Sequence, residues 1–207
     1  ARRRACLHMR IVLTFFWILV MALSVAVFTA TAVRAFFYSP DSEIHAPTIV
    51  SAETVYGPEM HPDRLVIPAI GIDAAVQHVG INGSGNMATP TNFQDVGWYK
   101  YGVVPGGRGS AVIAGHVDNG LGLSGVFKRL PETQPGDDIY VTAEDGTRTH
   151  FVVTSVRSYP YTEVPEDIVF NPRGSSRLNL ITCEGSWLPE SKTYDQRLVV
   201  FAKLAGE

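Results

Sequence analysis

The sequence predicts an all-β domain, a barrel or a sandwich, that follows a single N-terminal membrane-spanning helix. Three observations support this prediction. An uncharged apolar run occupies residues 11–33, about eight short β-type runs separated by glycine, proline and aspartate follow residue 63, and no long helical pattern or internal repeat interrupts them. A domain of roughly 140 residues can bury a sizeable core without disulfide bonds.

The apolar run at residues 11–33 is predicted to be a transmembrane anchor. As a helix rising about 1.5 Å per residue it is roughly 34 Å long, enough to cross a hydrocarbon layer of about 30 Å. The positive-inside rule predicts that residues 1–10 are cytoplasmic, because basic residues precede the run at Arg2, Arg3, Arg4 and Arg10. The run ends in small residues, Thr-Ala-Thr-Ala, and cleavage there as a signal peptide is the alternative.

Residues 34–62 are predicted to form an extracytoplasmic stalk. The segment contains Pro40, Pro47, Pro58 and Pro62 among polar residues, and such spacing favours an extended chain over a packed element. The globular domain is then expected to cover residues 63–207.

The β-type runs of the globular domain define its expected strands. They lie at residues 64–71, 74–81, 96–99, 110–117, 139–142, 149–156, 178–182 and 198–204. Asp145-Gly146 is a hairpin signal between two of these runs. Residues 124–130 are the best helical candidate of the extracytoplasmic part.

The charge distribution excludes a nucleic-acid-binding protein. All 20 acidic residues but only 12 of the 17 basic residues follow Arg34, so the extracytoplasmic part carries 12 minus 20, or −8. A surface of this sign repels a phosphate backbone. The same part has no basic stripe for anionic lipid, which leaves the N-terminal helix as the sole predicted membrane attachment.

The two cysteines, Cys6 and Cys183, are predicted to lie on opposite sides of the membrane, so they cannot pair within one chain. Cys183 follows the run 178–182, and Glu184-Gly185-Ser186 has the composition of a turn, so we expect the thiol at a strand end. A buried cysteine acting as a small hydrophobe is the alternative. A lone thiol in an oxidising compartment favours a reactive role.

His116 and Arg197 are the expected partners of the Cys183 thiol. His116 lies near the end of the run 110–117, directly after a glycine, and the other five histidines have weaker contexts. An imidazole can exchange a proton with a thiol, and a guanidinium stays charged and can stabilise an oxyanion. For Arg197 the alternative is a surface ion pair with Asp195.

No metal or phosphate site is expected. The histidines lack metal-binding spacing and the extracytoplasmic part has no second cysteine. The acidic residues Glu163, Glu166 and Asp167 are too few for a calcium site, which needs about six oxygen ligands. The glycine-rich residues 104–109 lack the Gly-Lys-Ser/Thr sequence of a phosphate-binding loop.

Taken together, Ala-Gly-His116, Leu-Ile-Thr-Cys183 and Asp-Gln-Arg197, behind one anchor and a stalk, resemble the sortase family of bacterial cysteine transpeptidases. The sequence Ala-Gly-His-Val-Asp118 is most similar to class F sortases of actinobacteria. The family's cysteine motif is usually Thr-Leu-x-Thr-Cys, and this chain has Asn179 in place of its first threonine. This difference affects the assignment of the subclass and the detailed contacts with the substrate. It does not affect the chemistry, because the nucleophile Cys183 and the preceding Thr182 are retained.

The resemblance implies a closed eight-stranded β-barrel with short helices over residues 63–207, on the outer side of the cell membrane. It also implies recognition of a Leu-Pro-x-Thr-Gly-like sorting signal at the C-terminus of secreted proteins. Cleavage would fall between Thr and Gly, and the acyl group would pass to an amine of a cell-wall precursor. No cofactor is implied.

In the implied reaction Cys183 attacks the peptide carbonyl, His116 protonates the departing nitrogen, and Arg197 stabilises the oxyanion or the substrate. Thr182 and Glu184 are weaker candidates for substrate or oxyanion contacts. Two other functions stay open on the sequence: a hydrolytic cysteine endopeptidase with water as acceptor, and a catalytically inert, membrane-tethered binding module.

Overall fold

A computed structural model describes residues 2–37, 44–46, 60–119 and 121–206 of the chain. The chain divides into two compact units, Ala1–Tyr38 and Ser39–Glu207. The first unit is the helix α1 (Arg2–Phe37), and its segment Leu13–Val33 is long and apolar enough to cross a membrane. The second unit is built almost entirely of strands.

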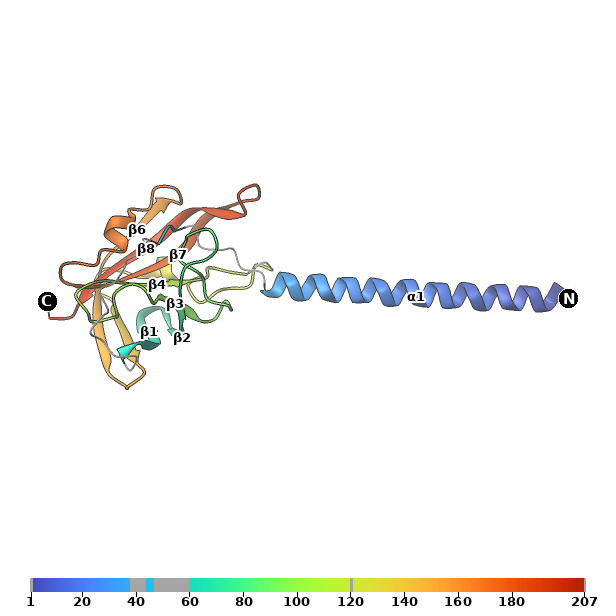
Figure 1. The fold of residues 1–207 in the computed structure, drawn as a ribbon, viewed down its shortest axis with the longest axis horizontal. Coiled ribbons are helices and arrows are strands. Elements are labelled where there is room, and N and C mark those ends of the chain that lie inside the picture. Colours follow the sequence, from blue (N-terminus) through green and yellow to red (C-terminus); the bar gives the residue numbers. More distant parts are fainter. Residues whose placement is uncertain (1, 38–43, 47–59, 120, 207) are drawn as a thin grey trace. The chain divides into compact units, whose positions relative to one another are not determined.

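The second unit is a closed eight-stranded barrel, as the resemblance implied (Figure 1). Its strand order is β1-β2-β3-β4-β7-β8-β6-β5, and β1 pairs with β5 to close the barrel. The pairs β2/β3 and β4/β7 are parallel and the others antiparallel. The strands are β1 (Pro62–Ile67), β2 (Ile72–Val79), β3 (Val96–Tyr99), β4 (Gly109–Gly115), β5 (Asp138–Ala143), β6 (Arg148–Pro160), β7 (Ser176–Leu188) and β8 (Thr193–Leu204).

Strand β4 is buried on both faces, which explains its continuous apolar sequence. On one face Ala111 and Ile113 belong to the barrel interior, and on the other Val112 and Ala114 belong to a second apolar cluster. That cluster includes Val169 of the short helix α2 (Glu166–Val169). Strand β4 is therefore covered by apolar side chains on the inside and the outside of the barrel wall.

The helix expected at residues 124–130 does not form. The segment makes turns and ends in a single 3-10 turn, η3 (Leu130–Glu132). Its amide groups are used by distant partners: Val126 N donates to Phe93 O, and Phe127 N donates to His116 O at 2.9 Å. These tertiary hydrogen bonds replace the local ones that a helix would need.

Strand β7 continues through residues 184–186, where the sequence predicted a turn. The pairing with β8 shifts register between Glu184 and Trp187, and Gly185 has φ 85°, which marks a bulge rather than a chain reversal. The Asp195 carboxylate lies directly against Gly185 and accepts a hydrogen bond from Ser186 N at 2.7 Å. The prediction that Cys183 ends its strand is therefore wrong, and the thiol lies within a long hairpin.

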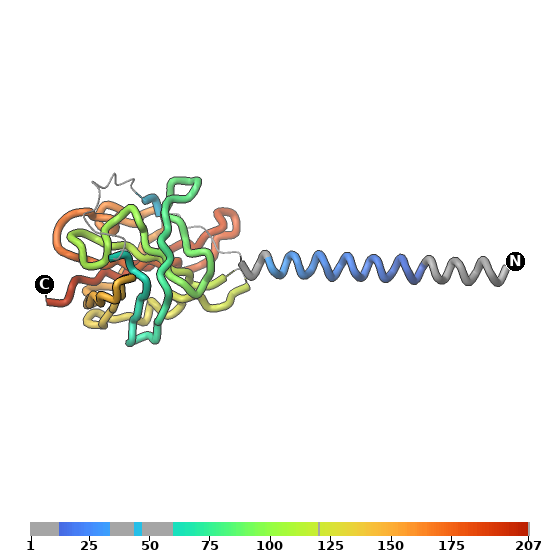
Figure 2. Tube along the Cα trace, turned by 60° about the horizontal axis from the view of Figure 1, so that its bottom comes forward, coloured from blue at the N-terminus to red at the C-terminus, as the bar shows by residue number. Residues whose placement is uncertain are grey.

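Residues 44–46 lie against the barrel, although they fall within the segment 34–62 expected to be a stalk (Figure 2). Ile44 is 2% exposed, and its carbonyl accepts a hydrogen bond from Met87 N. His45 N donates to Glu166 Oε1 at 3.0 Å. Ile44 packs in the second apolar cluster, although the Pro-rich composition of its segment predicts no packed element.

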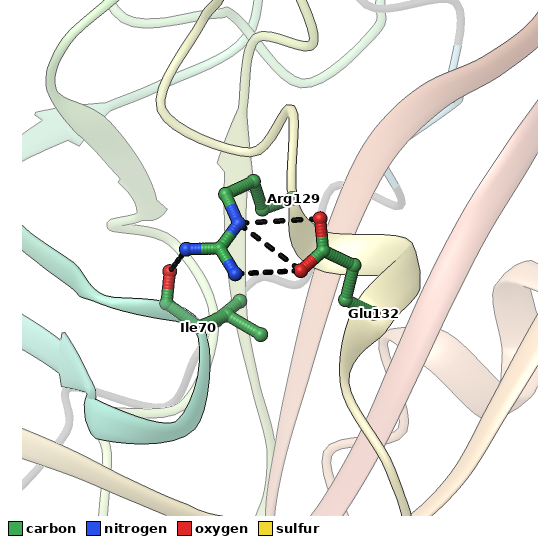
Figure 3. A network of polar contacts seen from close by, with 3 residues as sticks. All are labelled: Ile70, Arg129 and Glu132. Atoms are coloured by element: carbon green, nitrogen blue, oxygen red, sulfur yellow. Dashed lines mark hydrogen bonds and ion pairs between the residues drawn. The ribbon is translucent and has the colours of Figure 1, made fainter.

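A polar network joins η3 to the 3-10 turn η2 (Pro68–Ile70) on the surface (Figure 3). Arg129 donates to the carbonyl of Ile70 at 2.9 Å and to Glu132 Oε2 at 2.7 Å. Hydrogen bonding from this guanidinium holds the pKa of Glu132 below its ordinary value. The carboxylate is thus charged at neutral pH, and the small contribution of this exposed pair is lost as the pH falls through the lowered pKa.

Replacement of Ile44 by Ala should destabilise the barrel by about 2–5 kcal/mol, because it leaves a cavity against the second apolar cluster. The melting temperature of the 207-residue chain in detergent, followed by near-ultraviolet circular dichroism, measures this loss. His45→Ala is the matched control, since the His45 side chain is exposed and its backbone hydrogen bond to Glu166 is retained. Equal melting temperatures for Ile44→Ala and the unmodified chain would show that residues 44–46 do not pack on the barrel in solution.

Candidate active site

The parallel register of β4 and β7 sets the positions of two candidate residues. Its last pair is Ala114 with Ile181, and beyond it the Thr182 hydroxyl donates to the Gly115 carbonyl at 2.8 Å. One residue further along each chain are His116 and Cys183. The two residues are 67 positions apart in the sequence, and the register brings them side by side at the same end of the β4–β7 pair.

The His116 ring is buried and makes a hydrogen bond with the loop before β3. Its ring is buried, with 5% of the residue exposed, and Nε2 lies 3.1 Å from the carbonyl oxygen of Pro90. A carbonyl can only accept, so Nε2 carries the proton in this hydrogen bond. Nδ1 is then the ring nitrogen whose protonation can change while the ring keeps its orientation.

Cys183 forms no disulfide with any residue that the structure describes, and it is partly exposed. The alternative of a fully buried cysteine therefore does not apply. Its Cα partner in the neighbouring strand β8 is Arg197, which directly precedes the expected strand 198–204. Arg197 is in fact the fifth residue of β8, because the hairpin extends further than its apolar pattern indicates.

Arg197 is almost completely buried, with 1% of the residue exposed. Its Nη1 donates to the carbonyls of Tyr194 and Gln196, both at 2.9 Å, and its Nη2 donates to Thr193 Oγ1 at 2.7 Å. The alternative of a surface ion pair with Asp195 is wrong. Across the part of the barrel that the structure describes, no ion pair includes Arg197, and its hydrogen-bond acceptors are all neutral.

A single pocket brings the three residues together. Its polar lining comes from His116, Cys183 and Arg197, with Thr89 and Thr182, and its apolar lining comes from Ile44, Ala114 and Ile181. A thiol, an imidazole and a guanidinium around one apolar pocket can supply a nucleophile, a proton carrier and a fixed positive charge. The apolar lining suits an aliphatic side chain of a peptide.

The two weaker candidates differ in position. Thr182 lines the pocket, but its hydroxyl is engaged with Gly115, so the role that the structure gives it is to fix the β4–β7 register. Glu184 is absent from the pocket lining and accepts a hydrogen bond from the Ser158 hydroxyl of β6. Substrate contact by either residue stays a prediction.

Sequence reasoning missed three contributors to the site. Ile44 lines the pocket from a segment without periodicity, and Pro90 orients the imidazole from an irregular loop. Tyr194 donates to Asp118 at 2.6 Å beside the pocket. None of these three residues carried a sequence signal, whereas Asp118, the acceptor of the Tyr194 hydrogen bond, lies two residues after His116 in the motif that resembles class F sortases.

Comparison with known proteins agrees with this arrangement. The family model described as a sortase domain matches residues 65–205, more than half of the chain. This chain belongs to the sortase family. Sortases are cysteine transpeptidases, and the matched residues include Cys183, His116 and Arg197 of the pocket. No curated protein matches the chain.

Solved sortase structures share the fold of this sortase domain. Sortase A from Corynebacterium diphtheriae is 21% identical with a TM-score of 0.52, over 70% of this chain and 60% of that one. Sortase C-1 from Streptococcus pneumoniae is 22% identical with a TM-score of 0.52, over 70% of this chain and 67% of that one. The present sortase thus spans less than two thirds of the C. diphtheriae chain. At these identities the likeness shows the barrel fold.

Replacement of Thr182 by Val should lower the free energy of unfolding by about 1–3 kcal/mol, because the buried Gly115 carbonyl loses its donor while the side-chain shape is kept. Urea denaturation of the 207-residue chain in detergent measures the change. Thr182→Ser is the control, since it keeps the hydroxyl. A Val variant as stable as the Ser variant would show that this hydrogen bond does not hold the register.

Proposed function

We propose that this sortase is a membrane-anchored transpeptidase. It cleaves a Leu-Pro-x-Thr-Gly-like sorting signal between Thr and Gly through a Cys183 thioester, and transfers the acyl group to an amine of a cell-wall precursor. Its clients are secreted proteins that carry the signal at their C-terminus. The helix α1 anchors the enzyme with its N-terminus in the cytoplasm and the barrel outside.

The observation that carries this proposal is the buried guanidinium of Arg197 in the pocket of Cys183. Burying a charge costs several kcal/mol per ion unless an opposite charge or strong hydrogen bonds compensate. Here the hydrogen-bond acceptors are two backbone carbonyls and one hydroxyl, all neutral. A site of this kind gains most when negative charge develops in the pocket, on a thiolate or on the oxyanion of a tetrahedral intermediate.

The first half of the reaction forms the thioester. The Cys183 thiolate attacks the threonyl carbonyl carbon, and Arg197 stabilises the negative charge on the carbonyl oxygen. His116 gives its Nδ1 proton to the glycyl nitrogen as the carbon–nitrogen bond breaks. The Gly-bearing fragment leaves as an amine, and the imidazole is neutral.

The second half regenerates the enzyme. The acceptor amine attacks the thioester carbonyl, and neutral His116 takes the proton that this nitrogen loses. The carbon–sulfur bond breaks, a new amide remains, and Cys183 leaves as the thiolate beside an imidazolium. No cofactor or metal is needed, because thiol and imidazole supply the nucleophile and the proton carrier. The motif around His116 supports assignment to class F.

The direct test is incubation of the 207-residue chain in detergent with a Leu-Pro-x-Thr-Gly peptide, followed by mass spectrometry. Cleavage between Thr and Gly and a thioester at Cys183 are expected, together with a hydroxamate product on addition of hydroxylamine or an amide product on addition of a peptide amine. A hydrolysed peptide alone, with the amine present, would assign the protein to the hydrolytic endopeptidases. An unmodified peptide and an inert thiol would assign it to binding modules.

Cys183→Ala should abolish thioester formation, and His116→Ala should lower kcat by about 10²-fold or more, because the leaving nitrogen loses its proton donor. The matched control is Cys6→Ser, which removes the other thiol and leaves the pocket unchanged. Product formation is followed by mass spectrometry under saturating peptide. Turnover by Cys183→Ala would refute the mechanism.

Arg197→Lys should lower kcat by about 10²-fold or more, because lysine keeps the charge but loses the planar fork of donors. Thr193→Val is the control for a purely structural role of Arg197. It removes the hydrogen-bond acceptor of Arg197 Nη2 and leaves the guanidinium in place. Steady-state kinetics distinguishes the two. An equal loss in both variants would mean that Arg197 serves only to hold the hairpin.

A further inference from the structure

One contact crosses from the loop after His116 to the hairpin that carries Cys183 and Arg197. The Tyr194 hydroxyl on β8 donates to Asp118 Oδ2 at 2.6 Å, and the two residues are 76 positions apart in sequence. A hydrogen bond from a phenol to a carboxylate is charge-assisted and stronger than one between neutral groups. Both side chains are half-buried, which limits competition from water.

Asp118 is joined to His116 through a tightly folded loop. Phe127 N donates to His116 O, and Gly125 N donates to Val117 O, each at 2.9 Å. Gly125 packs so closely that a Cβ there would lie 2.3 Å from His116 O. The backbone between His116 and Asp118 is therefore fixed, so a contact that fixes Asp118 also restricts the position of His116.

Tyr194 is equally well fixed on the hairpin. Its backbone carbonyl accepts the hydrogen bond from Arg197 Nη1, and its ring packs edge-to-face on Trp187, with 5.4 Å between the ring centroids. Tyr194 thus contacts the loop of the proposed general acid through its hydroxyl and the proposed oxyanion ligand through its carbonyl.

The phenol stays protonated and can act as a donor at neutral pH. Burial and the Asp118 carboxylate raise the pKa of Tyr194, with a smaller contribution from Cys183. Tyr194 is a neutral group that fixes the loop without adding negative charge to the pocket.

We propose that Tyr194 is a positioning residue for acyl transfer: its hydrogen bond to Asp118 holds the loop after His116 against the β7–β8 hairpin, so that the imidazole and the Cys183 thiol keep a fixed relation. The inference rests on the proposed function, because the reaction defines what must be positioned. A displacement of about 1 Å in such a site can cost 10²-fold in rate.

Tyr194→Phe tests the proposal in the 207-residue chain in detergent, because it removes the hydroxyl and keeps the ring and the backbone carbonyl. We expect kcat for peptide cleavage to fall about tenfold or more with KM changed less than about twofold, since the loss falls on the chemical steps. Tyr140→Phe is the control, because Tyr140 stacks on His150 in β5 and β6. An unchanged kcat, or a raised KM alone, would overturn the proposal.

The Asp118 variants separate positioning from a general loss of stability. Asp118→Asn keeps an oxygen that can accept from Tyr194 and should retain more kcat than Asp118→Ala. The double variant Tyr194→Phe/Asp118→Ala should lose no more than the larger single loss, because both changes break one interaction. Losses that multiply in the double variant would overturn the pairwise contact as the cause.

Hydrogen exchange read by mass spectrometry gives a result that does not depend on turnover. Amides of residues 117–119 and 121–124 should exchange faster in Tyr194→Phe, and those of β5 and β6 should not change. If the unmodified chain cleaves no sorting peptide, the proposed function fails, and the exchange of this loop still decides whether the contact holds it. Unchanged exchange would overturn the contact itself.

Discussion

The parallel pairing of β4 with β7 is the constraint on which the pocket depends. Strand β4 and the half of β7 that pairs with it are largely buried, and a shift of one residue would turn the side chains of one strand to the opposite face. The hydrogen bond from Thr182 to the Gly115 carbonyl joins the two strands at the residues directly before Cys183 and His116. A thiol and an imidazole separated by 67 positions therefore gain a fixed relation from backbone geometry.

The β7–β8 hairpin adds charge to this arrangement. Arg197 lies opposite Cys183 and is buried with neutral acceptors from its own strand, so its positive charge is available to the pocket. The bulge at Gly185 lets the hairpin continue past the thiol, and this extension carries Tyr194 to Asp118. The strand that holds the proposed oxyanion ligand thus also contacts the loop of the proposed proton carrier.

The apolar side of the pocket comes partly from outside the matched sortase domain. Ile44 precedes residue 65, where the family match begins, and yet it lines the pocket with Ala114 and Ile181. Ile44, from the segment between the helix and the barrel, therefore forms part of the pocket lining. Peptide selectivity in the proposed reaction would depend on this residue together with those of the barrel.

The sequence by itself determined the class of fold, the apolar N-terminal helix and the residues His116, Cys183 and Arg197 that meet in the pocket. These features depend on local patterns: period-two alternation, an uninterrupted apolar run, and short motifs beside apolar runs. The same local reasoning failed at residues 124–130 and 184–186, where distant hydrogen-bond partners override the propensity for a helix and for a turn.

Only the tertiary structure decided what surrounds these residues. Arg197 is buried although its apolar neighbours in sequence gave no sign of this. Three contacts join segments far apart in sequence: the hydrogen bond of His116 with Pro90, the packing of Ile44 and the contact between Tyr194 and Asp118. Such contacts depend on strand order and register, which form when the barrel closes. The sequence determined which chemical groups are present, and the closure of the barrel decided which of them meet, because pairing between distant strands leaves no periodic signal along the chain.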